Sequence, residues 1–278
     1  EEIDVSSLSP ELLAELNEIG GSEANVATGY HAIEFLLWGQ DQHGYEAGAG
    51  ERPASDFAQG EDCSNGHCDR RRAYLKAASQ LLINDLEWMV AQWAPVDGDN
   101  YRSELTAQPA EEGLRRILFG MGSLSLGELA GERMKVALEA NSYEDEHDCF
   151  SDNTHNSHYY NGQGIQNVYT GSYQRIDGTT LEGPGVEALL AQRDSELAQT
   201  LEQQIEASMD ALGTLKETAE RSDSPMTFDM MIAPSNDQGA AIVNDAILAL
   251  VTQTGSIEQA AGKLGVTSLQ PDDAGHTF

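Results

Sequence analysis

The sequence has few basic residues, with 15 Lys and Arg against 47 Asp and Glu, and its formal net charge is −32. A field of that sign repels the phosphates of nucleic acids and anionic membrane surfaces, so we exclude nucleic-acid binding as a function. The sequence also lacks any run of about 18 apolar residues, and we therefore expect no segment that spans a membrane. An acidic surface of this kind is typical of secreted or salt-adapted proteins, and it attracts cations.

Strand-like alternation of apolar and polar residues is absent as well. The apolar residues instead recur with a period near 3.6, most clearly over 68–93, 183–221 and 236–253, with breaks expected at 120–122 and at Gly255. Helices with one apolar face each bury those faces best in antiparallel bundles. The sequence therefore predicts an all-α protein with long loops between its helices.

Cysteine is scarce, with three residues in the chain. Cys63 and Cys68 enclose Ser-Asn-Gly-His in a stretch rich in turn residues, which favours a short disulfide formed in an oxidising compartment. The alternative is a metal site in which His67 joins the two thiolates. Cys149 has no obvious partner, and we interpret it as a buried thiol.

One helical stretch, 29–41, combines apolar residues with groups that can carry chemistry. His31, Glu34, Trp38 and Asp41 fall at i, i+3, i+7 and i+10 and form one stripe of the predicted helix. An imidazole and a carboxylate one turn apart can both reach one metal ion. They can equally form a simple hydrogen bond on a half-buried face, since His-x-x-Glu is common by chance.

The segment 143–180 is rich in Asp, Asn, Gly and His and has little apolar periodicity, so it is predicted to be a structured polar loop with at most short helical turns. Histidine and carboxylate together suit iron, zinc or manganese, whereas carboxylates alone suit calcium or magnesium. The alternative is a polar loop held by its own Asx turns. Its potential ligands are Glu144, Asp145, Glu146, His147, Asp148, Asp152, His155 and His158.

Gly29-Tyr30-His31-Ala32-Ile33-Glu34 matches the Gly-x-His-x-x-Glu motif of the imelysin family, and the chain resembles that family over nearly its whole length. Within the family it is most similar to the subgroup named for iron-regulated protein A. The resemblance implies two pseudo-symmetric helical bundles, which we place at 1–120 and 121–278. The supporting stretches are Asn25–Thr28, Phe35–Asp41, Leu124–Met134, Glu144–His155 and Asn167–Tyr169.

The resemblance also implies a metal site, with iron as the expected ion and zinc as the alternative. His31 and Glu34 are its expected ligands, and further ligands are expected among Glu132, Glu146, His147, Asp152 and His155. Residues expected to surround and orient the ligands are Trp38, Asp41, Glu128 and Arg133. Glu128, Glu132 and Arg133 also fall close together on one helix side, where an internal ion pair is the simpler interpretation.

Three functions are compatible with these residues. The first is a periplasmic or cell-surface protein that binds a metal ion or iron chelate during iron acquisition, with an outer-membrane or surface partner. The second is a zinc metallopeptidase, the activity for which the family was named, although the sequence has no His-Glu-x-x-His. The third is a non-catalytic binding module. The chain begins at Glu1 without a signal peptide, and family members carry further helices upstream. We therefore expect a processed form, with a first bundle that either is completed by another fragment or chain or leaves an apolar face exposed.

Overall fold

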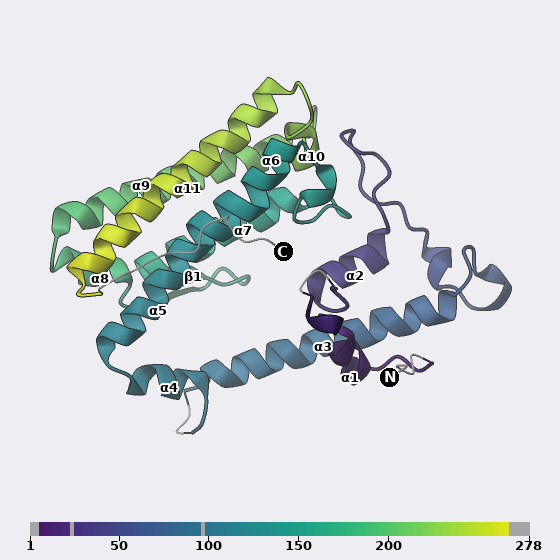
Figure 1. The fold of residues 1–278 in the computed structure, drawn as a ribbon, viewed down its shortest axis with the longest axis horizontal. Helices are drawn as coiled ribbons and strands as arrows, with labels where there is room; N and C mark the ends of the chain where they lie inside the picture. Colours follow the sequence, from purple (N-terminus) through teal and green to yellow (C-terminus); the bar gives the residue numbers. More distant parts are fainter. Residues whose placement is uncertain (1–5, 23–24, 96–97, 267–278) are drawn as a thin grey trace. The chain divides into compact units, whose positions relative to one another are not determined.

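The computed structural model describes residues 6–22, 25–95 and 98–266. Within them the regular secondary structure is helical apart from one two-stranded sheet, which confirms the predicted all-α fold. The chain divides into two compact units, whose elements Figure 1 labels. Unit 1 contains the chain up to His43 and Gly48–Leu105, and unit 2 contains Gly44–Ala47 and the chain from Thr106.

Unit 1 is built on one long helix, α3, with two shorter helices packed along it (Figure 1). Ser9 caps α1 by accepting a hydrogen bond from the Leu12 amide at 3.2 Å, with Pro10 at the first helical position, as the sequence predicts. The buried core is small: Leu13, Ala77 and Ala78. The helical elements are α1 (Pro10–Leu16), η1 (Ile19–Gly21), α2 (Gly29–Trp38), η2 (Ala54–Phe57), η3 (Gly60–Asp62), α3 (Cys68–Trp93) and α4 (Tyr101–Ala107).

Unit 2 is a bundle in which α11 packs against both α9 and the π-helical segment η4, while α7 packs against α9. Its core comprises two clusters, one around Leu129, Leu212 and Leu250 and one around Leu118, Leu201 and Ile257. The elements are α5 (Ala110–Ser123), η4 (Leu124–Lys135), α6 (Val136–Ala140), η5 (Tyr143–Asp145), α7 (Thr154–Thr170), β1 (Ser172–Gln174), β2 (Thr180–Glu182), α8 (Val186–Ala191), α9 (Ser195–Ala219), α10 (Phe228–Met231) and α11 (Asp237–Lys263).

Three predicted helix boundaries are wrong. The helix does not end at 120–122, because α5 continues directly into η4 and α6, and Gly255 likewise lies inside an unbroken α11. A glycine in a helix interior costs only about 1 kcal/mol, which packing offsets. Conversely, the single helix expected over 183–221 is two helices, because the Asp194 side chain accepts a hydrogen bond from the Leu197 amide and starts α9 anew.

The prediction of a loop over 143–180 is wrong for 154–170, which is the helix α7. Its buried face includes His155, His158, Gly162, Ile165 and Tyr169, which recur at helical spacing. Only two of these five are apolar, so hydrophobic periodicity does not reveal the helix. The close approach of α9 explains the glycine, since a Cβ at Gly162 would lie 2.4 Å from Leu212 Cδ1.

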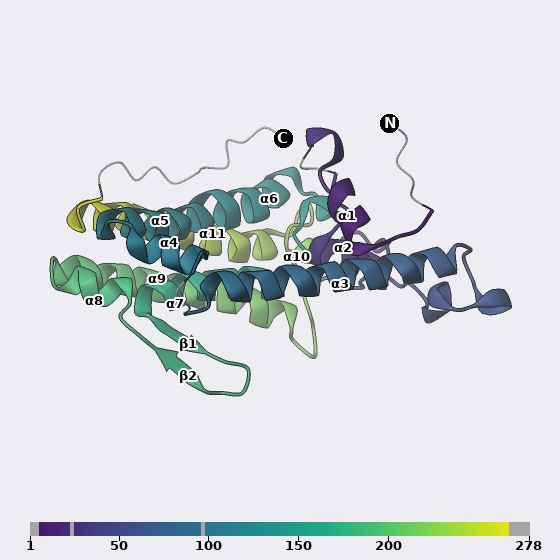
Figure 2. The same ribbon diagram turned by 90° about the horizontal axis from the view of Figure 1, so that it is seen from below.

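A β-hairpin that the sequence did not predict follows α7. Strands β1 and β2 pair antiparallel and extend away from the bundle of unit 2 (Figure 2). The two ends of the hairpin meet at glycines: the Gly183 amide donates to the Gly171 carbonyl at 2.8 Å, and a Cβ at Gly171 would lie 2.3 Å from the Gly183 oxygen. Gly171 also has φ +72°, a conformation that other residues rarely adopt.

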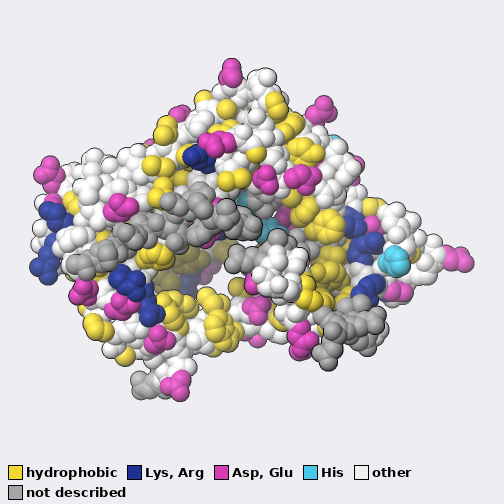
Figure 3. Space-filling view, viewed as in Figure 1, with side chains coloured by type: hydrophobic (Ala, Val, Ile, Leu, Met, Phe, Trp, Pro, Cys, Tyr) yellow, Lys and Arg dark blue, Asp and Glu magenta, His cyan; other side chains and the backbone are white. Residues whose placement is uncertain are grey.

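Helix α11 has the length and apolar composition of a membrane span, with a mean hydropathy of 1.3 over its best window. Core helices pass the same test, and α11 lies in the core of unit 2, where the Gln253 amide donates to Ser125 Oγ at 2.8 Å. Ser125 Oγ in turn donates to the Leu250 carbonyl at 3.0 Å. On the surface, acidic side chains are spread over much of the face seen in Figure 3.

Candidate functional site

Helix α2 of unit 1 carries the His-x-x-Glu pair, and a glycine stands at each end of it. Gly29 begins the helix at φ +85°, and Gly39 ends it at φ +79° while its amide donates to the Phe35 carbonyl at 2.8 Å. Both φ values are in the left-handed region that favours glycine. Gly29, the glycine of the Gly-x-His-x-x-Glu motif, therefore sets the direction in which the helix leaves the preceding chain.

His31 and Glu34 contact each other on α2. His31 Nδ1 lies 2.9 Å from Glu34 Oε2, with the His31 side chain 41% exposed and the Glu34 side chain 9% exposed. This distance fits a hydrogen bond. It also fits two atoms bound to one metal ion, because bond lengths of about 2.1 Å place neighbouring ligand atoms roughly 3 Å apart. The pair can therefore hold an ion from one side, and its donor types suit iron or zinc.

The predicted stripe does not extend to Asp41, because α2 ends at Trp38 and Gly39 turns the chain away from the helix axis. Asp41 lies in the following loop instead, where its buried carboxylate accepts a hydrogen bond from the His43 amide at 2.7 Å. The Trp38 side chain is partly exposed at the last helical position.

Arg52 fixes the end of α2, a role that the sequence did not predict. Its amide donates to the Trp38 carbonyl at 2.8 Å, and its guanidinium donates to the Phe35 carbonyl at 3.3 Å and lies 5.4 Å from the Phe35 ring centroid. Gly50 permits this approach, since a Cβ there would lie 2.6 Å from the Trp38 oxygen. The segment after α2 thus fits against the end of the helix that bears His31 and Glu34.

The same arginine connects α2 to a buried carboxylate, Asp56. Arg52 Nη1 donates to Asp56 Oδ2 at 3.1 Å, Ser64 Oγ donates to Oδ1 at 2.8 Å, and Asn65 also donates to Oδ1. Arg71 of α3 donates to the Asp56 backbone carbonyl at 2.7 Å. Asp56 therefore organises much of the long segment between α2 and α3. No periodic pattern in the sequence predicts that the Asp56 side chain is buried.

A disulfide joins Cys63 to Cys68, the pairing that the sequence favours over a metal site with His67. Cys68 is the first residue of α3, so the bridge ties the start of this helix to the segment that contains Asp56.

In unit 2, two of the predicted ligands lie together with a residue that was not predicted. One carboxylate oxygen from each of Glu146, Asp152 and Asp229 lies within 4.8 Å of those of the other two. Glu146 is 5% exposed and Asp229 is 1% exposed. Burial, together with the charges of Asp229 and Asp152, raises the pKa of Glu146 to about 9. Asp229 comes from α10, far along the chain, and its only sequence signal is an acid within the apolar run Met226–Ile232.

The histidines of this region do not form one group. The His147 ring stacks on the His158 ring with centroids 6.2 Å apart, whereas His155 Nε2 lies 3.6 Å from Glu220 Oε1 of unit 2. His158 is fully buried, and burial, with the charge of His147 next in effect, lowers its pKa to about 3. His158 is therefore neutral at physiological pH.

The predicted cluster on η4 is in part an ion pair. Arg133 Nη2 lies 2.6 Å from Glu128 Oε2, which matches the simpler interpretation of these residues, while Glu132 is half-buried on the same segment.

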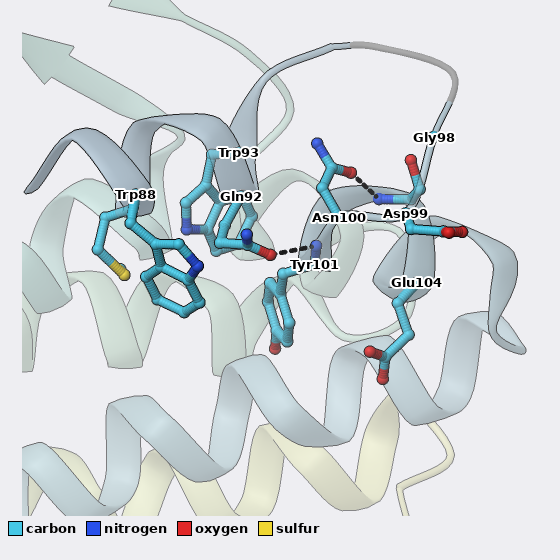
Figure 4. A pocket seen from close by; sticks show the side chains of 10 residues that line it. Trp88, Gln92, Trp93, Gly98, Asp99, Asn100, Tyr101 and Glu104 are labelled. Atoms are coloured by element: carbon cyan, nitrogen blue, oxygen red, sulfur yellow. Dashed lines mark hydrogen bonds between the residues drawn. The ribbon is translucent and has the colours of Figure 1, made fainter. Parts of the chain in front are cut away.

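Unit 1 also contains an aromatic pocket of about 900 Å³ between the end of α3 and α4 (Figure 4). The Trp93 and Tyr101 rings meet at 69° with centroids 5.2 Å apart, and Trp88 lines the same pocket. The Tyr101 amide donates to Gln92 Oε1 at 3.1 Å and fixes the start of α4. None of the predicted ligands lines this pocket.

The family described as Imelysin (Peptidase_M75) matches residues 2–257 of the chain. No curated protein matches it. The match covers both units and includes α2, the Asp56 segment and the three carboxylates of unit 2, and it agrees with the all-α architecture. The chain therefore belongs to the imelysin family.

Proposed function

We propose that this imelysin-family protein binds a metal ion outside the cytoplasm and serves iron acquisition, with a site built around His31 and Glu34. The observation that carries the proposal is the 2.9 Å separation of His31 Nδ1 and Glu34 Oε2 on a helix whose end is fixed by Arg52. Imelysin-family proteins are generally exported, which supports the location. The net charge of −32 adds an attraction for cations.

Two ligands on one helix leave most coordination positions to water, so a site that retains iron or zinc needs further donors. The predicted source is the segment 144–155. Within it, Glu146 and Asp152 lie beside Asp229, and His155 lies beside Glu220. Glu132 and His147 are the other predicted ligands, and the titration described next tests His147.

The test is calorimetric titration of the purified chain with Fe(II), Fe(III) and Zn(II), alongside His31→Ala, Glu34→Ala and His147→Ala. Loss of a ligand should weaken binding by about tenfold or more. The matched control is His43→Ala, because His43 Nε2 lies 3.8 Å from Glu51 in another histidine–glutamate pair of unit 1. Binding should also weaken as the pH falls through about 6, since histidine must be neutral to bind metal.

If all the variants bind like the wild type, or if nothing binds more tightly than about 1 mM, the metal proposal is wrong and the pair is a structural hydrogen bond. In that case His31→Ala and Glu34→Ala should lower the stability of the folded chain and leave its metal affinity unchanged. Cleavage of unstructured peptides by the zinc-loaded wild type, lost in Glu34→Ala, would instead support a metallopeptidase.

A further inference from the structure

The three carboxylates of unit 2 have an arrangement that favours a bound cation. Glu146 and Asp152 belong to the segment that precedes α7, and Asp229 belongs to α10, so two separate parts of the chain converge on one point. Three like charges within 4.8 Å of one another repel strongly in a buried place, where the effective dielectric constant is low. A proton or a bound cation at this point would reduce that repulsion.

Glu146 gives the independent indication of a ligand. Its side chain is buried, and it takes part in none of the ion pairs found in the described part of the chain. Neither of its carboxylate oxygens has a hydrogen-bond partner of ordinary geometry there, and the nearby Thr154 side chain does not prevent the pKa of Glu146 from rising. A buried carboxylate without donors is costly. Asp56 of unit 1 shows the usual solution, with donors from Arg52, Ser64 and Asn65 around a carboxylate of similar burial. Glu146 instead faces two other acids.

The number and spacing of the oxygens favour a metal cation over a proton. A proton links two oxygens, whereas three converge here. Calcium binds carboxylate oxygens at about 2.3–2.6 Å, so its ligand atoms can lie up to roughly 5 Å apart, which accommodates all three. The group contains neither thiolate nor imidazole, and carboxylate oxygens are the ligands of hard cations.

We propose that Glu146, Asp152 and Asp229 bind one divalent cation that prefers oxygen ligands, with Ca²⁺ as the ion. The ion ties the segment before α7 to α10 and stabilises unit 2. This site requires neither His31 nor Glu34, and it goes beyond the function proposed above.

The test is a Ca²⁺ titration of the chelator-treated full chain, followed by calorimetry and by the far-UV circular dichroism melting temperature. Sodium chloride at equal ionic strength separates a specific ion from general screening of the negative charge. The wild type should bind one Ca²⁺ and melt at a higher temperature, with a weaker response to Mg²⁺. Asp229→Asn and Asp152→Asn should bind Ca²⁺ at least tenfold more weakly. Glu139→Gln, at an exposed acid beside Lys135, should behave like the wild type.

The amide variants also show whether protonation, rather than a bound cation, offsets the repulsion among the three carboxylates. An amide imitates a protonated carboxyl, so Glu146→Gln should fold, should be at least as stable as the wild type without Ca²⁺, and should lose the Ca²⁺ response. A wild type that shows no Ca²⁺ effect beyond that of sodium chloride overturns the proposal, as does an Asp229→Asn variant that binds Ca²⁺ unchanged. His31→Ala should still bind Ca²⁺ and melt at a higher temperature in its presence. Failure of the Ca²⁺ proposal can therefore be distinguished from failure of the proposed iron or zinc site.

Discussion

At the scale of single residues, Asp56 and Glu146 show two opposite ways of burying a carboxylate. Burial alone would raise the pKa of Asp56, but hydrogen bonds from Ser64, Asn65 and Arg52, with the charge of Arg71, outweigh it and hold that pKa below its ordinary value. Burial and neighbouring acids move the pKa of Glu146 in the other direction, to about 9. The first carboxylate therefore contributes to stability as an anion, and the second needs a proton or a cation.

Asp56→Ala should destabilise unit 1 by about 3 kcal/mol at pH 7, because it leaves Arg52 without its buried partner. The tryptophans of the chain, Trp38, Trp88 and Trp93, all lie in unit 1, so urea unfolding followed by tryptophan fluorescence reports on this unit alone. The control is Asp69→Ala, which removes an 80% exposed acid paired with Arg72 and should change stability by less than about 1 kcal/mol.

The same carboxylate should make unit 1 sensitive to acid. The pKa of Asp56 is lower in the folded chain than in the unfolded chain, so its contribution is complete above the unfolded value near 3.8 and is lost as the pH falls through the folded value. The stability difference between the wild type and Asp56→Ala should therefore shrink below about pH 4. A difference that stays constant down to pH 2 would contradict this role.

At the scale of elements, α7 shows how polar residues and glycine can form the buried face of a helix. Gly162 lies against α9, where an added Cβ would meet Leu212 Cδ1 at 2.4 Å and Met209 Sδ at 3.2 Å. Gly164, two residues on, faces open space, with nothing within 4 Å of an added Cβ. The two glycines share a helix and differ in what surrounds them.

Gly162→Ala should destabilise unit 2 by about 1–3 kcal/mol through overpacking against Leu212. Gly164→Ala should instead stabilise it by up to about 1 kcal/mol, because alanine has the higher helix propensity. Thermal unfolding followed by far-UV circular dichroism measures both changes. Equal effects of the two substitutions would mean that α7 does not pack on α9 through Gly162.

The helices predicted from the sequence are those with an apolar stripe, such as α3, α9 and α11, because hydrophobic periodicity is the signal that local sequence carries. Helix α7 was not predicted, because His155, His158 and Gly162 lie on its buried face and interrupt the apolar periodicity. The spacing of His31 and Glu34 is enough by itself to predict that both lie on one face of a helix. Asp229 was missed because its proximity to Glu146 arises from tertiary packing, which no local pattern records.

At the scale of the whole molecule, the charge of −32 is the dominant property. Mutual repulsion of the acids opposes the compact state in both units. Raising sodium chloride from about 0.01 M to about 1 M shortens the Debye length from roughly 30 Å to 3 Å, so the melting temperature should rise at pH 7. The same comparison near the sequence pI of 4.2 should give a much smaller rise, because little net charge is left to screen. Equal salt effects at both pH values would contradict the repulsion argument.

The hairpin β1–β2 enters and leaves unit 2 at the contact between Gly171 and Gly183, and most of its residues are exposed. Beyond that contact, residues 173–176 line a pocket together with residues of α7 and α9, whereas 177–179 lie at the turn of the hairpin. The turn is consequently a natural insertion point, where a fluorescent label, an epitope or a purification tag can be placed away from the bundle. A reporter at this position would let metal loading and partner capture be followed in a protein that is otherwise unaltered.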